Sequence, residues 1–242
     1  MRWLACGAGA LPAELNWLTR YEAERAAGLR MPKRRTEYLL RRLAAKRAVA
    51  TVLGMPADSR SLARIEVRNA PSGAPYVLVD GAPAGVTVSL SDRAGRALCV
   101  VGTGTVGCDL ELVEPRSAGF VRDFLTAPER AYVAAAADPD LAANLVWSAK
   151  ESALKVLRTG LRRDTRSVEV TVHDGRSADW QPLSVRTAEG SRLPGWWRRE
   201  GHFLLTVVGE VAGPSPVPLA AHRVPCPAPA RRSGTGAGSA PG

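Results

Sequence analysis

Two short segments of the chain contain residue types that together could bind a metal ion and a phosphate. In the first, Val106–Glu111, two carboxylates lie two residues apart at Asp109 and Glu111. Alternate residues of a strand face the same side, so both carboxylates would project from one face, opposite Cys108 and Leu110. Like charges at that spacing repel each other, and a divalent cation would relieve the repulsion. Alone the pair is a weak signal, because a solvent-facing strand with ordinary acidic residues has the same pattern.

The second segment, Trp147–Lys155, adds a third carboxylate and two lysines. On a helix, Trp147, Glu151 and Lys155 fall in one stripe, where Glu151 and Lys155 would commonly form only an i,i+4 ion pair worth roughly 0.2–0.5 kcal/mol. Because Trp147 is costly to leave in water, we expect something else to cover that face. Three carboxylates without histidine favour Mg²⁺, which also binds phosphate oxygens. Lys150 and Lys155 are then placed to neutralise charge on a phosphate leaving group.

Helices and short strands must position these segments. Apolar residues at helical spacing predict helices over residues 33–53 and 138–157, and Thr126–Glu129 has the pattern of a capping box that begins another helix. Strand-forming residues on either side of Gly102–Gly104 predict a hairpin over residues 96–110. Similar runs between Gly and Pro turns predict further strands at 63–68, 75–79, 86–90, 167–173, 183–187 and 202–208.

The order of a helix followed by strands occurs twice, which predicts an α+β fold. We expect two pseudo-twofold-related halves, each a small antiparallel sheet packed with a long helix. The first half would span residues 1–102 and the second residues 103–212. Residues 213–242 are rich in Pro, Gly and Ala, which predicts a disordered tail. No clear sequence repeat accompanies the pseudosymmetry, which therefore rests on the order of the elements alone.

The composition narrows the class of protein. The chain has 242 residues, 45% of them hydrophobic, and a formal net charge of +10. This charge favours polyanionic partners, whether nucleic acid, phosphorylated small molecules, anionic lipid or an acidic protein. The four cysteines form no CxxC pair and only three histidines occur, which argues against a zinc site and for a reducing compartment. No apolar run approaches the roughly 20 residues that span a bilayer, so we expect a cytoplasmic protein.

The two acidic segments resemble the motifs of the 4′-phosphopantetheinyl transferases, specifically the larger type that primes surfactin synthetase (Sfp-type). Gly107-Cys108-Asp109-Leu110-Glu111 matches the family's strand motif G-[IVC]-D-[IVL]-E. Trp147–Lys155 matches W-[ST]-x-K-E-[AS]-x-x-K throughout, and Thr159-Gly160-Leu161 follows at the family's spacing. The two motifs at this separation are highly specific together, and a weaker resemblance covers residues 30–210.

The resemblance implies an enzyme that moves the phosphopantetheine arm of coenzyme A onto a serine of an acyl or peptidyl carrier protein and releases 3′,5′-ADP. It also implies a pseudo-twofold pair of α+β halves, of which the first binds coenzyme A and the second carries the metal site and the catalytic helix. Asp109, Glu111 and Glu151 would hold Mg²⁺ on the diphosphate. Glu151 would also act as the base, while Lys155 and Lys150 would stabilise the departing charge.

For coenzyme A, the resemblance implies contacts from the early helix, from a turn and from a strand end. The sequence departs from the family at the last two places. Ala74 replaces a basic residue in the turn, and Asp92 stands where a histidine usually meets the 3′-phosphate. An anionic Asp92 would weaken phosphate binding, although the adjacent Arg93 could replace the lost charge. The implied contacts are Arg35, Arg42, Lys46, Gly73, Pro75, Ser91, Asp92 and Arg93.

Three interpretations of function follow, in decreasing order of support. The first is a Mg²⁺-dependent enzyme that activates carrier proteins of a fatty-acid, polyketide or nonribosomal-peptide pathway. Its partners would be coenzyme A and a carrier protein, without membrane or nucleic acid, and it would act as a monomer because one chain contains both halves. The second is a family member with weakened turnover that binds carrier proteins. The third is a basic nucleic-acid-binding module, which rests on charge alone because no aromatic stacking motif lies among the basic runs.

Overall fold

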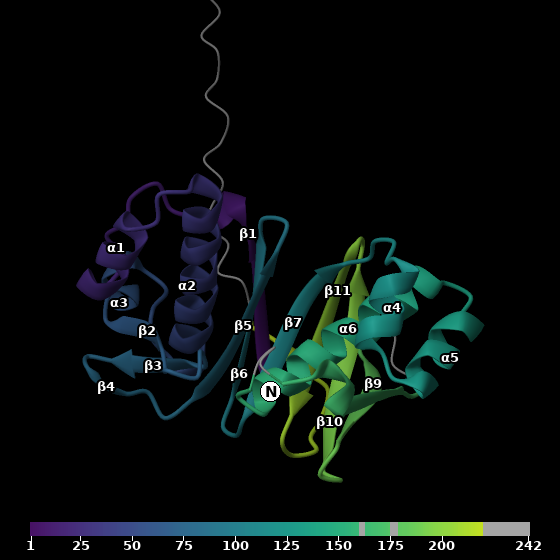
Figure 1. The fold of residues 1–242 in the computed structure, drawn as a ribbon. Coiled ribbons are helices and arrows are strands. Elements are labelled where there is room, and N and C mark those ends of the chain that lie inside the picture. Colours follow the sequence, from purple (N-terminus) through teal and green to yellow (C-terminus); the bar gives the residue numbers. More distant parts are fainter. Residues whose placement is uncertain (160–162, 175–178, 220–242) are drawn as a thin grey trace, which may run out of the picture.

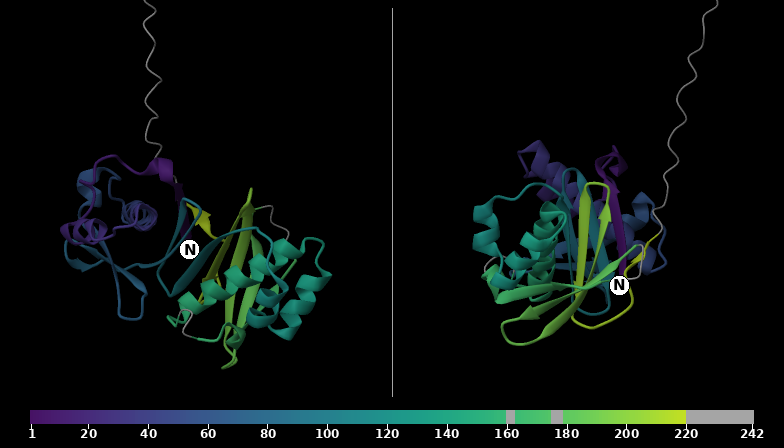
Figure 2. Two further views of the ribbon diagram at one scale, coloured as in Figure 1. Left: turned by 45° about the horizontal axis from the view of Figure 1, so that its top comes forward. Right: turned by 90° about the vertical axis from the view of Figure 1, so that its right-hand side faces the viewer.

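The computed structural model describes residues 1–159, 163–174 and 179–219. It has the predicted α+β fold, arranged in four layers (Figures 1 and 2). Two sheets lie back to back in the middle. A long helix covers the outer face of each sheet: α2 (Pro32–Val52) lies on the first and α6 (Pro139–Val156) on the second. The boundary between the two sheets therefore brings together residues from both ends of the chain.

In the first half, α2 packs on a sheet with strand order β12-β1-β6-β5 and on a smaller sheet, β2-β3-β4. Within the larger sheet, β1, β6 and β5 are antiparallel, and β12 lies parallel to β1. The remaining elements of this half are β1 (Arg2–Gly7), η1 (Ala8–Ala10), α1 (Arg20–Ala27), α3 (Ser59–Leu62), β2 (Ile65–Asn69), β3 (Pro75–Val79), β4 (Ala82–Pro83), β5 (Thr87–Arg93), β6 (Arg96–Gly102) and β12 (Val217–Pro218).

In the second half, α6 packs on an antiparallel sheet with strand order β7-β11-β10-β9-β8. Two shorter helices, α4 and α5, lie beside α6 on the same side of the sheet (Figure 1). The remaining elements of this half are β7 (Val106–Leu112), α4 (Ala118–Phe124), α5 (Ala127–Ala135), η3 (Thr165–Ser167), β8 (Val168–Val172), β9 (Gln181–Thr187), β10 (Arg192–Glu200) and β11 (Phe203–Gly209).

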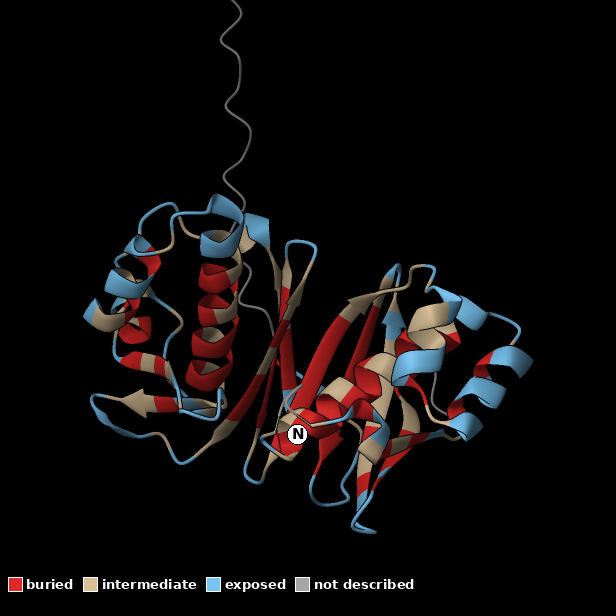
Figure 3. Cartoon of the chain, viewed as in Figure 1, coloured by how far each residue is buried: buried red, intermediate tan, exposed pale blue. Residues whose placement is uncertain are grey.

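Both long helices lie where the sequence predicts them. Each begins with a proline at its first position, Pro32 in α2 and Pro139 in α6, where the missing N–H would have no helical partner. In α6 the Asp138 side chain also caps the helix by accepting a hydrogen bond from the Leu141 backbone N–H at 3.0 Å. Figure 3 shows that much of each long helix is buried. The spacing of apolar residues in the sequence is therefore enough to predict the positions of both long helices.

The predicted hairpin over residues 96–110 is wrong. β6 and β7 belong to different sheets, so the chain passes from one half to the other between Gly102 and Val106. The hairpin that forms is β5–β6, which turns at Ala94 and Gly95. These residues have φ angles of 47° and 75°, as in the two-residue turns that suit the twist of a hairpin.

The two sheets pack against each other through an apolar cluster that alternates along the strands. Trp3, Leu98 and Val100 of the first sheet meet Cys108 and Leu110 of the second. On β7 this leaves the opposite face, with its two carboxylates, toward α6. The predicted division of the β7 side chains between two faces is therefore present in the structure.

A buried ion pair ties together four segments of the first half. Glu22 is the third residue of α1 and closes a capping box with Thr19. Its other carboxylate oxygen accepts a hydrogen bond from the Val67 backbone N–H of β2 at 3.0 Å. The Lys46 ammonium of α2 pairs with Glu22 and donates to the Trp17 carbonyl at 2.7 Å. Lys46 and Glu22 are both fully buried.

The second half repeats this arrangement. Glu129 closes a capping box with Thr126 at the start of α5 and accepts a hydrogen bond from the Val170 backbone N–H of β8 at 2.7 Å. The Lys150 ammonium of α6 pairs with Glu129 at 2.8 Å and donates to the Thr165 carbonyl at 2.9 Å. The two halves thus share a capping glutamate, a helical lysine and a strand N–H in equivalent places, which supports the pseudo-twofold relation at the level of side chains.

The packed part of the chain extends beyond residue 213, where the tail was predicted to begin. Val217 and Pro218 of β12 pair with Arg2 and Trp3 of β1. Leu219 then joins the core of the first half with 9% of its surface exposed. The rest of the predicted tail, residues 220–242, lies outside the described residues.

Candidate functional site

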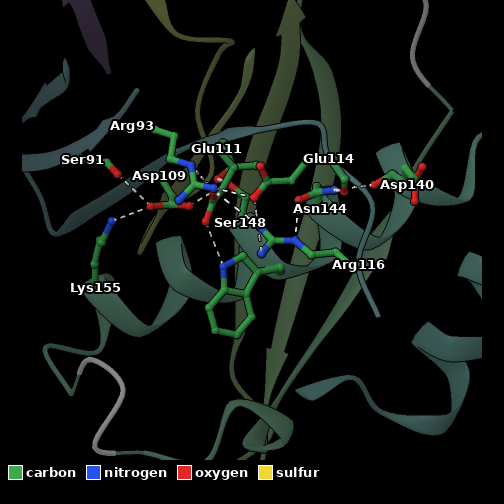
Figure 4. Close-up of polar contacts among 12 residues, drawn as sticks. Ser91, Arg93, Asp109, Glu111, Glu114, Arg116, Asp140, Asn144, Ser148 and Lys155 are labelled. Atoms are coloured by element: carbon green, nitrogen blue, oxygen red, sulfur yellow. Dashed lines mark hydrogen bonds and ion pairs between the residues drawn. The ribbon is translucent and has the colours of Figure 1, made fainter. Parts of the chain in front are cut away.

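Asp109 lies where the two halves meet and receives hydrogen bonds from both of them (Figure 4). Its Oδ1 accepts from the Ser91 hydroxyl of β5 at 2.8 Å and from the Lys155 ammonium of α6 at 2.9 Å, and its Oδ2 accepts from Ser148 at 3.0 Å. Lys155 also donates to the Cys108 carbonyl at 2.7 Å. Burial is the largest single influence and lowers the pKa of Lys155, but Asp109, Cys108 and Glu151 together outweigh burial and raise the pKa above its ordinary value. Lys155 is therefore held as a cation at the junction of the halves.

Small residues allow α6 to approach β7 closely enough for these contacts. A Cβ atom added at Gly107 would lie 1.9 Å from the Ser152 carbonyl oxygen of α6. Ser148 and Ser152 both hydrogen-bond the Thr206 hydroxyl of β11 at 2.8 Å. Because Ser148 then donates to Asp109, this buried chain of hydroxyl groups fixes the orientation of the carboxylate. Gly107 is required here by packing, since its φ does not lie in the left-handed region.

Glu111 lies two residues along the same face of β7. Its Oε1 accepts a hydrogen bond from the Trp147 indole at 3.1 Å. Its Oε2 has no hydrogen-bond partner among the described residues, but guanidinium nitrogens of Arg93 and Arg116 each lie 3.5 Å away. Burial raises the pKa of Glu111, and the nearby Asp109 carboxylate adds to the rise while the two arginines oppose it.

Glu151 completes an acidic cluster on α6. Its Oε1 is buried without a hydrogen-bond partner among the described residues, and no ion pair within 4.0 Å is formed there with Lys155, which turns to Asp109 instead. Burial raises the pKa of Glu151 to about 7, and the Asp109 and Glu111 carboxylates contribute to the rise against Lys155. The negative charge of the three carboxylates is thus only partly compensated within the described chain.

The cover over Trp147 is an aromatic cluster from α4. The Phe120 and Phe124 rings lie 5.1 and 5.2 Å from the Trp147 ring. The expected cover on this stripe of α6 is therefore supplied by the protein, and the Trp147 N–H is used to hold Glu111.

The donor set fits a hard divalent cation. Carboxylate oxygens without histidine or cysteine are the ligands that Mg²⁺ prefers. Glu111 Oε2 and Glu151 Oε1 are buried oxygens that lack a hydrogen bond within the described chain. Asp109 uses three of the roughly four acceptor positions of a carboxylate. Within the described ranges, no three His, Cys, Asp or Glu side chains are already gathered as in a metal site, so an ion would have to draw these oxygens together.

A cavity of about 690 Å³ opens beside Asp109, between α2, β3 and β5 of the first half and the end of α6. Of the predicted contacts for coenzyme A, Arg42, Gly73, Pro75, Ser91 and Asp92 line this cavity. The charged residues of its walls are cationic except for Asp92, which suits a ligand with several phosphates. The cationic residues that line it are Arg25, Arg34, Arg41, Arg42, Lys155 and Arg158.

Three predicted contacts are corrected by the structure. Lys46 and Lys150 are fully buried in their ion pairs with Glu22 and Glu129, so neither ammonium can reach a phosphate in the cavity. Arg35 is exposed and does not line the cavity, whereas Arg34 does. Lysines on a helix are usually solvated, and the sequence does not show which of them meets a buried glutamate.

Asp92 and Arg93 have different ion-pair partners. Asp92 forms an ion pair with Arg41 of α2 at the wall of the cavity. Arg93 instead pairs with Glu111 and Glu114 and lines a second cavity of about 530 Å³. The cation that compensates Asp92 is therefore Arg41, not Arg93 as the sequence suggested.

Several lining residues were missed from the sequence. Arg34 and Arg41 lie seven residues apart, two helical turns, on the same helix as the predicted contact Arg42, which also lines the cavity. Arg158 follows the end of α6 with a φ of 55°, and Arg25 lies on α1. No pattern in the sequence distinguishes these two from other surface arginines.

Comparison with known proteins agrees with the acidic site. Residues 105–194 match the family model of the 4′-phosphopantetheinyl transferase superfamily (ACPS). The matched segment runs from just before β7 into β10, so it contains Asp109, Glu111, Glu151 and Lys155. A search of curated proteins found no match. None of the helices in the described ranges is long and apolar enough to cross a membrane.

Proposed function

We propose that the protein transfers the 4′-phosphopantetheine arm of coenzyme A to a serine of an acyl or peptidyl carrier protein, as an Sfp-type enzyme that depends on Mg²⁺. The observation that carries the proposal is the junction at Lys155. This residue binds Asp109 of the acidic cluster and also lines the cationic cavity. A ligand with phosphates in the cavity would thus bring them to the carboxylates. The superfamily match over residues 105–194 supports phosphopantetheinyl transfer in general.

Each residue of the site has a role in this reaction. Asp109, Glu111 and Glu151 would hold Mg²⁺, which supplies positive charge to the diphosphate. Glu151 takes the proton of the carrier serine, whose oxygen forms a bond to the phosphorus next to the pantetheine arm. The bond from that phosphorus to 3′,5′-ADP breaks, and Lys155 stabilises the negative charge on the leaving group. We further propose that one chain suffices, because Ser91 of the first half binds Asp109 of the second.

A second candidate is a carrier-binding protein with weak turnover, which the Asp92 carboxylate in the cavity motivates. The ion pair with Arg41 compensates that charge, and five further cationic residues line the same wall. Lys155 also binds Asp109 and lines the cavity, which supports a working site. We therefore favour the active enzyme.

Mass spectrometry of apo carrier proteins separates the two candidates. With coenzyme A and Mg²⁺, an active enzyme adds the arm, a mass gain of roughly 340 Da. Glu151→Gln keeps the shape of the side chain but removes the base and one metal ligand, so transfer should be lost while the melting temperature stays close to that of the wild type. Carrier binding without a mass gain would support the weak-turnover protein. Salt-sensitive DNA binding with neither would support the nucleic-acid-binding module.

A further inference from the structure

Two arginines from different halves of the molecule hold the Glu111 carboxylate. Arg93 comes from the end of β5 in the first half, and Arg116 follows β7 in the second (Figure 4). Each places a guanidinium nitrogen 3.5 Å from Glu111 Oε2, the oxygen that has no hydrogen bond among the described residues. Both also pair with Glu114. Positive charge from the protein therefore occupies the place where a bound cation would be expected.

Arg116 is fixed in position by neutral groups as well as by charge. Its Nε donates to the Asn144 side-chain oxygen at 2.7 Å, and its guanidinium lies 4.8 Å from the centre of the Phe120 ring. Asn144 is itself held by the Glu114 carbonyl at 2.6 Å. Only 17% of the Arg116 side chain is exposed. This arginine has no nearby position into which it could withdraw without breaking the network.

Arg93 is held only by carboxylates in the part of the chain that the structure describes. Its ion pairs there are with Glu111 and Glu114, and 39% of its side chain is exposed. It lines the second cavity, of about 530 Å³, which gives the side chain room to move. It also lies next to Ala94, the first residue of the β5–β6 turn. Of the two arginines, Arg93 is the one that can leave Glu111.

We propose that Arg93 is a resident counter-ion of the acidic site and that a divalent cation must displace it from Glu111 in order to bind. Mg²⁺ binds carboxylate oxygens at about 2.0–2.1 Å, so an ion on Glu111 Oε2 would repel both guanidinium groups at close range. Arg116 is held by neutral contacts as well, so Arg93 is the one that leaves. The inference rests on the proposed function, because it takes Glu111 as a metal ligand. It adds that metal binding opens a contact between the two halves, since Arg93 and Glu111 belong to different ones.

The test measures metal affinity directly, without coenzyme A or a carrier protein. Mn²⁺ is titrated into the full chain and free Mn²⁺ is followed by electron paramagnetic resonance at constant ionic strength. Arg93→Gln should bind Mn²⁺ about tenfold more tightly than the wild type, because a unit charge a few ångströms from the ion is removed. Arg93→Lys keeps the charge and should stay within about threefold of the wild type.

Arg96→Gln provides a matched control. Arg96 is the register partner of Arg93 on the same hairpin, but it pairs with Glu200 and lies over the Phe203 ring. The same loss of charge there should leave the Mn²⁺ affinity within about threefold of the wild type if the effect is local.

The outcomes distinguish this inference from the proposed function. Equal or weaker Mn²⁺ binding by Arg93→Gln would overturn the displacement while leaving the metal site in place. An equal gain in Arg96→Gln would also overturn it, because the effect would then be one of net charge. If neither the wild type nor Arg93→Gln binds Mn²⁺ at millimolar concentration, both the displacement and the Mg²⁺ part of the proposed function are wrong.

Discussion

The contact between β7 and α6 at Gly107 makes a specific prediction for the substitution Gly107→Ala. The added Cβ would lie 1.9 Å from the Ser152 carbonyl oxygen and 2.9 Å from the Ser152 carbonyl carbon, where real Cβ contacts closer than 3.0 Å essentially never occur. Both neighbours are backbone atoms inside a long helix, so they cannot rotate away. α6 and β7 must therefore separate by about 1 Å, an overpacking that typically costs about 1–3 kcal/mol.

The same displacement should also reduce catalysis. α6 carries Glu151 and Lys155, and β7 carries Asp109, so the substitution moves the two sides of the acidic cluster apart. Misplacement of catalytic groups by about 1 Å can lower a rate by about 100-fold. For a chain of this size the loss of stability should lower the melting temperature by roughly 2–12 °C, which leaves the protein folded at 25 °C.

Urea unfolding and the rate of phosphopantetheine transfer at 25 °C measure the two effects on the same preparation. Gly104→Ala is the matched control, because a Cβ there meets no heavy atom within 4 Å and Gly104 has no left-handed φ. It should match the wild type in both assays. If Gly107→Ala also matches the wild type in both, the close approach of α6 to β7 does not exist in solution and the geometry of the site is wrong.

Three further predictions test individual parts of the site. Lys150→Met should lower the free energy of unfolding by roughly 3–5 kcal/mol, because Glu129 is left as an unpaired buried charge. Lys155→Met should instead reduce transfer and lower the free energy of unfolding by less, because Asp109 keeps its hydrogen bonds from Ser91 and Ser148; the reverse pattern would exchange the two roles. Asp92→His should lower the Michaelis constant for coenzyme A by releasing Arg41 from its carboxylate partner, and an unchanged constant would place Asp92 away from the phosphates. Removal of divalent cations by EDTA should stop transfer and excess Mg²⁺ should restore it, whereas full activity in EDTA would exclude the metal role.

The sequence predicts those parts of the fold whose signals are local. α6 has a capping aspartate, a proline at its first position and apolar residues at helical spacing, and each of these acts within a few residues. β10 was missed because its local signals argue against a strand. Pro194 and Gly195 lie inside it, and both are unusual in strand interiors. The reason for Gly195 is distant in sequence: a Cβ there would lie 2.5 Å from the Leu183 side chain of β9.

The same distinction applies to the functional residues. Asp109, Glu111 and Glu151 could be singled out because strand and helix periods place them on defined faces of β7 and α6. The exclusion of Lys46 and Lys150 from the phosphate contacts could not be foreseen, since their glutamate partners come from other segments of the chain. A comparison of the two halves would have helped, because both contain a Thr-x-x-Glu capping box followed by a helix with a central lysine.

The buried lysines also allow α2 and α6 to be aligned, which shows what each half contributes to the site. If Lys46 of α2 is aligned with Lys150 of α6, Glu151 corresponds to Arg47 and Lys155 to Thr51. The first half therefore keeps the ion pair that holds its helix to the capping glutamate, but it has no carboxylate at the position that faces the junction in the second half. Its contribution there is the cationic wall and the Ser91 hydroxyl. The two halves thus share one framework but carry different residues at equivalent positions. As a result the second half presents an acidic face and the first half a basic face across one boundary. The proposed binding of a diphosphate with a metal ion requires this arrangement.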